Sequence, residues 1–228
     1  VWCVLMHLIF RMVDKIIVPS LHNKREILTE YGISDEKVVQ INSYVTSLHT
    51  DKKIKIGKSD FIFIGRFSKE KGLKTVIQTM FKYKQVKPGF KCILAGSGPE
   101  EAWFLDQIKR LNLTENVAFS GYTDSPRSLI RVSNLLILPS YNEGIPIVIL
   151  EAYKEGVPVA VTPFNGADEV VKHNRVGIIS PRKNFAGDVI KLLEDDGKRQ
   201  KLARSTKPFV SKNYSIKNRD LFIEQILC

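Results

Sequence analysis

The 228-residue sequence has few of the features that mark several protein classes. Three cysteines are too few for a disulfide scaffold, and 14 glycines and 10 prolines are too few for a collagen-like or disordered chain. The most apolar stretch, residues 1–10, contains His7 and is followed by Arg11, so it falls short of the roughly 18 apolar residues of a membrane span. No basic region precedes it, so we expect no signal peptide either.

Metal-binding patterns are also lacking. The four histidines lie far apart in the sequence, and no Asp-x-Asp motif is present, so we expect no metal site. Negative charge is scarce by comparison, with 24 acidic against 35 basic residues and a net charge of +11. This excess predicts an anionic partner, either a phosphate-bearing ligand or an acidic membrane surface. Nucleic acid is not favoured, because no recognised binding motif accompanies the charge.

What the sequence does contain is an alternation of short apolar runs and longer amphipathic segments. The runs are residues 61–64, 92–95, 117–119, 135–138, 157–161 and 176–179. Runs this short and continuous fit strands buried on both faces of a parallel sheet. The pattern predicts an α/β fold with a doubly wound parallel sheet, and places Cys92, Trp103 and Phe104 in its core.

Residues 1–42 form a smaller unit with a helix, a strand at 15–18 and a second helix at 21–31, closed by Gly32. One isolated strand cannot build a sheet, so we expect this unit to be the remnant of another domain. Residues 42–59 are predicted to be a linker. The missing initiating methionine leads us to expect a piece of a longer protein.

In open parallel sheets, ligands bind at the carboxyl ends of the strands. Arg66 and Lys71 follow the first run and flank a helix start, where two cations could clamp a diphosphate; alone, two solvated surface charges would be the simpler interpretation. Gly96 and Gly98 follow the second run and let backbone approach a ligand. Glu101 replaces the third glycine of the dinucleotide fingerprint, which argues against an NAD-dependent oxidoreductase.

Two carboxylates are associated with the helix that is predicted to start near Pro146. Glu143 precedes it and Glu151 lies two turns along, on the order of 10 Å away, a distance suited to gripping two parts of an extended ligand. The alternative is that Glu143 caps the helix and Glu151 is solvated. The backbone N–H groups predicted to face the same space are those of Gly144, Ile145 and Ile147.

These motifs, in this order, resemble glycosyltransferase family 4. The resemblance rests on Gly65-Arg66 with Lys71-Gly72, on the Gly96–Pro99 turn, and on the segment PSYNEGIPIVILEA at 139–152. One departure is the segment 165–169, which keeps a single glycine where the family has two. Family members are retaining, nucleotide-sugar-dependent enzymes of the GT-B fold, with two Rossmann-like domains facing across a cleft.

The resemblance implies a domain division and a role for each site residue. Residues 1–42 would be a remnant of the N-terminal acceptor-binding domain, 43–205 the donor-binding domain, and 206–228 helices that pack toward the N-terminal domain. The implied roles are as follows: Arg66 and Lys71 hold the diphosphate, Glu151 the ribose, Glu143 with the amides of Gly144, Ile145 and Ile147 the sugar, and Gly65, Gly96 and Tyr122 line the donor site, the last two near the base. No cofactor or metal is implied, because basic side chains and helix termini carry the diphosphate charge.

The function implied is transfer of a hexose-type sugar, with retention, from a nucleoside diphosphate sugar to a saccharide or lipid-linked acceptor. Surface polysaccharide or glycoconjugate synthesis is the expected context, in the cytoplasm with peripheral contact to the inner face of the membrane. Because a GT-B site needs both walls of its cleft, we expect this chain to be inactive alone. A non-catalytic nucleotide- or protein-binding module remains the alternative.

Overall fold

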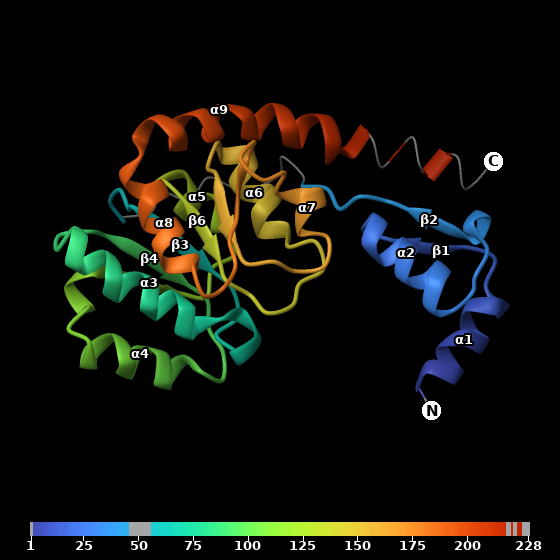
Figure 1. Ribbon diagram of the computed structural model, residues 1–228, viewed down its shortest axis with the longest axis horizontal. Coiled ribbons are helices and arrows are strands. Elements are labelled where there is room, and N and C mark those ends of the chain that lie inside the picture. Colours follow the sequence, from blue (N-terminus) through green and yellow to red (C-terminus); the bar gives the residue numbers. More distant parts are fainter. Residues whose placement is uncertain (1, 46–55, 218–219, 221–222, 225–228) are drawn as a thin grey trace.

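The structure, a computed structural model, describes residues 2–45, 56–217, 220, 223 and 224. It contains a large α/β unit with a six-stranded sheet and a small N-terminal unit with a two-stranded sheet (Figure 1). The predicted linker, 42–59, and the predicted C-terminal segment, 206–228, lie partly outside the described residues.

The large sheet is wholly parallel, as its continuously apolar strands predicted. Its order is β5-β4-β3-β6-β7-β8, so the chain winds outward in one direction from β3 and in the other from β6. The junction of β3 and β6 is therefore the topological switch point, where doubly wound folds bind their ligands. The strands are β3 (Phe61–Ile64), β4 (Cys92–Ala95), β5 (Val117–Gly121), β6 (Leu136–Leu138), β7 (Val159–Val161) and β8 (Gly177–Ile179).

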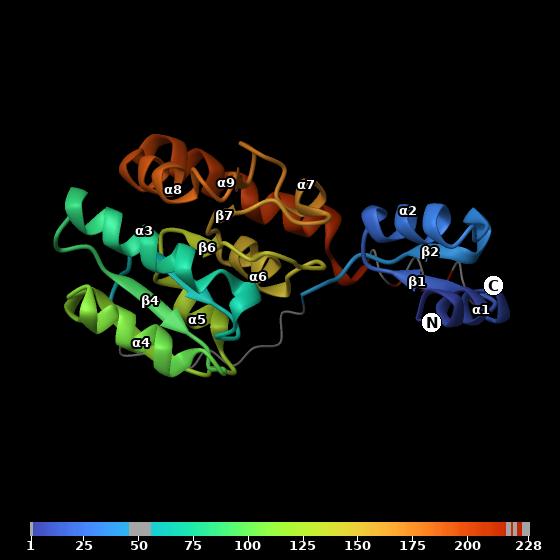
Figure 2. The same cartoon turned by 60° about the horizontal axis from the view of Figure 1, so that its bottom comes forward.

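Helices cover both faces of this sheet. α3 packs on α8. α6 packs between α5 and α9, and these three helices are neighbours in Figures 1 and 2. Two short 3₁₀ turns, Lys69–Lys71 and Thr114–Asn116, precede α3 and β5. The helices are α3 (Leu73–Val86), α4 (Glu101–Arg110), α5 (Pro126–Arg131), α6 (Ile147–Glu155), α7 (Ala167–Val170), α8 (Phe185–Glu194) and α9 (Asp196–Asn213).

The core is rich in aromatic rings. Phe61 stacks on Phe90 with ring centroids 5.9 Å apart, and Phe67 meets Phe104 edge-on at 5.2 Å. Full burial of each such ring contributes about 2 kcal/mol to the stability of the fold. The prediction of core positions is confirmed for Cys92 and Phe104, which are fully buried. Trp103 is only half-buried at the core's edge, because it lies in the first turn of α4.

The N-terminal unit corrects one expectation. Its elements are α1 (Trp2–Met12), β1 (Ile16–Val18), α2 (Leu21–Glu30), a 3₁₀ turn (Asp35–Lys37) and β2 (Val38–Gln40). β1 is not isolated, because β2 pairs with it in parallel. β2 escaped prediction because three residues, one of them polar, make no recognisable apolar run. Gly32 takes a positive φ of 59° after α2, which confirms its predicted role in ending that helix.

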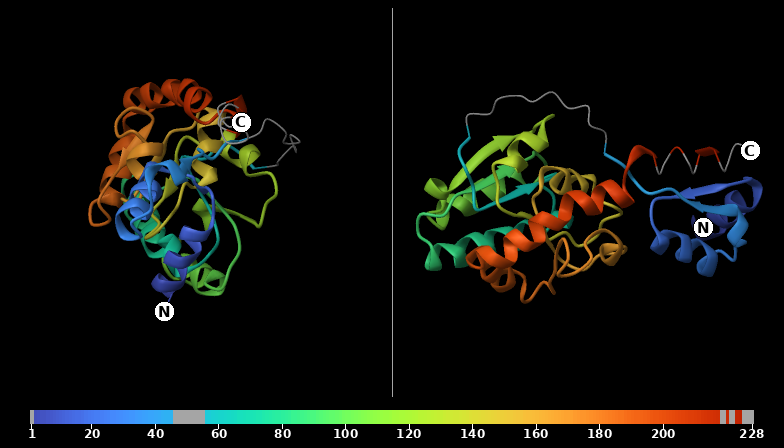
Figure 3. Two further views of the ribbon diagram at one scale, coloured as in Figure 1. Left: turned by 90° about the vertical axis from the view of Figure 1, so that its right-hand side faces the viewer. Right: turned by 90° about the horizontal axis from the view of Figure 1, so that it is seen from above.

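The C-terminal helix α9 connects the two units. It extends along the large unit toward the N-terminal unit (Figure 3), where the Asn42 side chain donates a hydrogen bond to the Asn213 carbonyl at 3.1 Å. The boundary predicted at residue 205 falls inside this helix. None of the helices in the described residues combines the length and apolar character that crossing a membrane requires.

Candidate functional site

The loops after β3 and β6 meet at the switch point. Lys71 ends the 3₁₀ turn after β3, and Glu143 lies in the loop between β6 and α6. Lys71 Nζ donates a hydrogen bond to Glu143 Oε1 at 2.8 Å. The Glu143 side chain is only 9% exposed and that of Lys71 23%, so this ion pair is partly shielded from solvent. The structure thus joins two of the predicted site residues directly.

A cavity of about 510 Å³ opens over the carboxyl ends of β3, β4 and β5. It is lined by Gly65, Arg66, Gly96 and Tyr122, four residues that the sequence analysis had placed in one site. Arg66 is exposed there, with no ion pair to another described residue. A guanidinium beside exposed glycine backbone is suited to an anionic ligand that carries a flat group.

Glycine is required at two places where loops at this edge of the sheet touch. Gly96 has a φ of 142°, and a Cβ built on it would lie 1.9 Å from the carbonyl oxygen of Gly65. Gly72 has a φ of 70°, and its Cβ would lie 1.9 Å from the carbonyl oxygen of Pro139. Any side chain at either position would therefore push apart two of the loops that form the site.

Helix α6 begins one residue later than predicted, with Pro146 as its N-cap and Ile147 as its first residue. The backbone N–H groups of Gly144, Ile145 and Ile147 donate no hydrogen bond to any described residue. Unpaired N–H groups at a helix N-terminus attract anions. The loop that carries Glu143 therefore also presents free donors, as the sequence predicted.

Glu151 is buried in α6, with 7% of its surface exposed. Burial raises its pKa to about 7, while Arg127 lowers the pKa and Glu155 raises it further. The alternative considered from the sequence, that Glu151 is solvated, is therefore wrong. One turn on, Glu155 accepts hydrogen bonds from Arg127 and Arg131 at 2.6 and 2.7 Å. No described residue donates a hydrogen bond to Glu151, so its carboxyl group can accept a ligand hydroxyl.

Arg182 is a site residue that the sequence analysis missed. It follows β8, and its guanidinium donates to the carbonyls of Pro139 at 2.6 Å and Ser140 at 2.9 Å. The same guanidinium lies 3.5 Å from the centroid of the Tyr141 ring. Arg182 therefore fixes the first half of the loop that carries Glu143. Arg182 follows the sixth apolar run, so inspection of the residues after each run would have identified it.

Glu169 lies in the segment that departs from the family pattern, and it reaches the N-terminal unit. Its carboxylate accepts hydrogen bonds from the backbone N–H groups of Leu21 at 2.8 Å and His22 at 2.9 Å, at the start of α2. A negative charge at a helix N-terminus is favourable. This contact holds the N-terminal unit against α7, the helix that follows β7.

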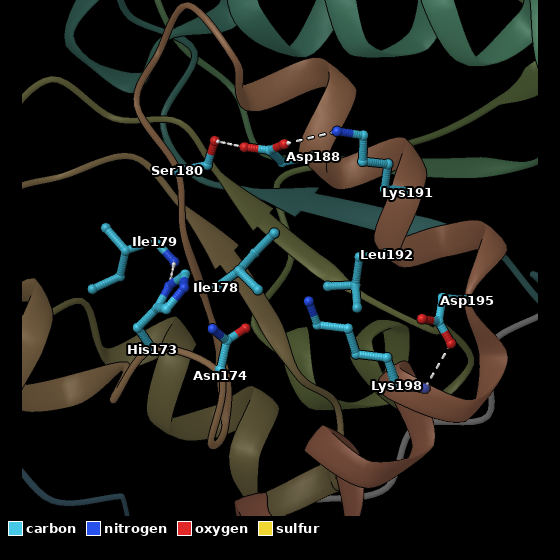
Figure 4. Close-up of a pocket in the computed structure, with 10 residues that line it drawn as sticks. All are labelled: His173, Asn174, Ile178, Ile179, Ser180, Asp188, Lys191, Leu192, Asp195 and Lys198. Atoms are coloured by element: carbon cyan, nitrogen blue, oxygen red, sulfur yellow. Dashed lines mark hydrogen bonds and ion pairs between the residues drawn. The ribbon is translucent and has the colours of Figure 1, made fainter.

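A smaller cavity of about 270 Å³ lies beside the edge strand β8 and α8 (Figure 4). Its polar groups bond to one another. Ser180 donates to Asp188 at 2.7 Å, and the Ile179 N–H donates to His173 Nδ1 at 3.0 Å. None of the predicted site residues lines it. In the described part of the chain, no group of three or more His, Cys, Asp or Glu side chains is arranged to hold a metal ion.

One family model and several known proteins match this chain. The family model described as glycosyl transferases group 1 matches residues 46–208. N-acetyl-alpha-D-glucosaminyl L-malate synthase of Bacillus anthracis is 27% identical over 175 residues, which are 75% of this chain and 45% of that protein. Glycogen synthase of Mycobacterium tuberculosis is 23% identical over 209 residues, 88% of this chain and 50% of that protein. The chain thus spans about half the length of these relatives.

A solved structure shares the fold. The crystal structure of Anabaena HepE in complex with UDP and glucose superposes with a TM-score of 0.83 at 21% identity, covering 98% of this chain and 65% of that one. At this identity, the likeness shows the fold alone. The fold class predicted from the sequence, a doubly wound α/β unit like the C-terminal domain of GT-B enzymes, is confirmed.

Proposed function

Because the chain belongs to the glycosyl transferases group 1 family, we propose that it is the donor-binding part of an enzyme that moves a sugar from a nucleoside diphosphate sugar to a saccharide or lipid-linked acceptor. The observation that carries the proposal is the Lys71–Glu143 ion pair next to the unpaired amides before α6, with the exposed Arg66 on the same loop after β3 as Lys71. HepE, which binds UDP and glucose on the same fold, supports it.

Each residue then has a role that follows from its position. The nucleoside lies in the cavity lined by Gly65, Gly96 and Tyr122, and Arg66 meets the diphosphate at the cavity's edge. The carboxylate of Glu151 accepts the ribose hydroxyls, which supply the hydrogen bonds that its buried carboxyl lacks.

Catalysis requires stabilisation of the leaving group. The bond between the anomeric carbon and the phosphate oxygen breaks, the acceptor oxygen forms the new bond, and its proton passes to the departing nucleoside diphosphate, on which negative charge develops as the old bond breaks. Arg66, Lys71 and the amides of Gly144, Ile145 and Ile147 stabilise that charge without a metal ion or cofactor. Glu143, held by Lys71, accepts a hydrogen bond from a sugar hydroxyl. Retention of configuration is part of the proposal.

The wider setting is also proposed. Residues 1–42 belong to the acceptor-binding domain, residues from 43 onward form the donor domain, and the end of α9 extends toward the acceptor domain. Because this chain spans about half the length of the relatives that it matches, we place the second wall of the cleft outside it and expect the chain alone to transfer little sugar. We place the reaction in surface polysaccharide or glycoconjugate synthesis, in the cytoplasm, with basic residues of α9 against the anionic inner face of the membrane.

Isothermal titration calorimetry of this chain with UDP, GDP, ADP and NADH tests the proposal. One nucleoside diphosphate is expected to bind, and Arg66→Ala is expected to weaken it roughly 10- to 100-fold, because a charge-assisted hydrogen bond is lost. Arg110→Ala is the matched control, since Arg110 is exposed and pairs only with Asp106 on its own helix. Binding of NADH that Arg66→Ala leaves unchanged, or no binding by a chain that circular dichroism shows to be folded, would overturn it.

A further inference from the structure

A second, larger cavity of about 630 Å³ lies between the start of α3, the start of α4 and the loop after β6. Four of the residues that line it are charged: Lys69, Lys74, Glu70 and Glu100. Two are aromatic, Trp103 and Tyr141. None of the residues assigned above to the donor lines it.

The charges of this cavity distinguish it from the nucleotide cavity. The lining includes two ammonium groups and two carboxylates, so it is close to neutral and offers both hydrogen-bond donors and acceptors. The hydroxyl of Ser68 donates to Glu70 at 2.6 Å, and this bond holds the pKa of Glu70 below its usual range. Glu70 is therefore an ionised acceptor at neutral pH. Such a lining suits a neutral ligand with many hydroxyl groups better than a phosphate.

The aromatic side chains add a rigid apolar surface. The guanidinium of Arg182 covers one face of the Tyr141 ring at 3.5 Å, and the Tyr141 backbone N–H donates to the Glu70 carbonyl at 2.7 Å. The ring nevertheless remains largely exposed, with 57% of the residue's surface open. Trp103 is half-buried against the core. A ring that is fixed before binding costs little entropy when a ligand packs on it.

We propose that this cavity is a saccharide-binding subsite. The apolar C–H face of a pyranose ring packs on the aromatic side chains, and its hydroxyls bond to the carboxylates and ammonium groups around them. Binding itself requires only the cavity.

The inference that the acceptor binds in this subsite rests on the proposed function. Tyr141 lies two residues before Glu143, and Glu70 immediately precedes Lys71, so the cavity shares two loops with the Lys71–Glu143 pair. A sugar chain held here would continue from the reacting centre, which points to an extended saccharide acceptor.

Tryptophan fluorescence provides a direct test, because the chain contains only two tryptophans, Trp2 and Trp103. In the Trp2→Phe variant, Trp103 is the sole reporter. Titration with maltotriose and with chitotriose is expected to give a saturable change with at least one of them, and mannitol, which has no ring, is expected to give none. No saturable change with either trisaccharide would overturn the proposal.

Three variants, each made in the Trp2→Phe background, locate the binding. Tyr141→Ala is expected to weaken trisaccharide binding at least tenfold, whereas Tyr141→Phe retains it, because the ring and not the hydroxyl is used. Glu100 lies at the start of α4 and not on the loop of Glu143, and Glu100→Gln is also expected to weaken trisaccharide binding. Equal trisaccharide binding by all three variants would contradict the assignment. So would a fluorescence change that UDP also produces and for which UDP competes with the trisaccharide. Arg66→Ala, which tests the nucleotide site, leaves the trisaccharide signal unchanged, so the two proposals fail separately.

Discussion

At the scale of single residues, the ligand-free site is held together by the groups that it would use on a ligand. Lys71 and Glu143 neutralise each other at 2.8 Å. Under the proposed function, an incoming phosphate would compete with Glu143 for Lys71, and a sugar hydroxyl would replace the bond that Glu143 loses. Arg66 is exposed and forms no ion pair with another described residue, so its guanidinium is available to an anion at this site.

The buried Glu151 predicts a pH dependence of stability. An unfolded glutamate has a pKa near 4.5, and the folded chain raises it to about 7. Between these values the unfolded state releases a proton that the folded state keeps, so the contribution of Glu151 to stability is complete below pH 4.5 and is lost as the pH rises to about 7. Glu151→Gln does not titrate and should gain roughly 3 kcal/mol relative to the wild type over that range.

Urea unfolding of both proteins at pH 5, 6, 7 and 8 measures this difference. The exposed Glu115→Gln serves as the control and should follow the wild type. A wild-type minus Glu151→Gln difference that stays constant with pH would show that the Glu151 carboxyl is not desolvated in the folded chain.

At the scale of elements, the structure shows that the site loops support one another. The loop after β8 supplies Arg182 to the loop after β6, and Gly72 allows the loop after β3 to lie against Pro139. The sequence predicted the six strands of the large sheet and their alternation with amphipathic segments, because apolar periodicity is a local property. It did not predict β2, which is too short to show a period, nor the partners of Arg182, which lie 42 and 43 residues away.

Arg182→Lys is predicted to weaken nucleoside diphosphate binding about tenfold. A lysine keeps the charge but cannot bond both carbonyls or stack flat on Tyr141, so the loop that carries Glu143 loses its support. Arg182→Ala should in addition destabilise the fold by on the order of 2 kcal/mol, because the Pro139 carbonyl is left unpaired.

Hydrogen exchange of residues 139–146, together with calorimetry, checks this prediction. Exchange in this segment should accelerate in both variants. The neighbouring exposed Lys183→Ala is the control and should leave both quantities unchanged. Wild-type exchange and affinity in Arg182→Lys would show that this side chain does not position the loop.

At the scale of the whole molecule, Glu169 joins the two units across 148 residues of sequence. Its carboxylate caps α2, and its backbone carbonyl accepts a hydrogen bond from the Tyr214 hydroxyl at 3.2 Å. Helix α7 follows the carboxyl end of β7. Because the cavity proposed for the nucleotide opens over the carboxyl ends of other strands of the same parallel sheet, the position of the N-terminal unit is tied to that side of the sheet.

Glu169→Ala is therefore expected to expose the N–H groups of Leu21 and His22 to exchange at least tenfold faster, because they lose their acceptor. Glu169→Gln, which keeps one amide oxygen, should show a smaller effect. NMR hydrogen exchange measures both amides, and the exposed Asp168→Ala is the control. Equal exchange in Glu169→Ala and the wild type would mean that the contact does not hold the N-terminal unit in solution.

The sequence by itself determined the fold class, which follows from the short apolar runs. It also predicted a site at the strand ends, from the glycine turns, the spacing of Glu143 and Glu151 and the resemblance to glycosyltransferase family 4. Only the tertiary structure decided that Lys71 bonds to Glu143, that Glu151 is desolvated, and that Arg182 and Glu169 support the site. The physical reason is that these contacts join elements distant in sequence, where partners are chosen by the geometry of packing and leave no local pattern.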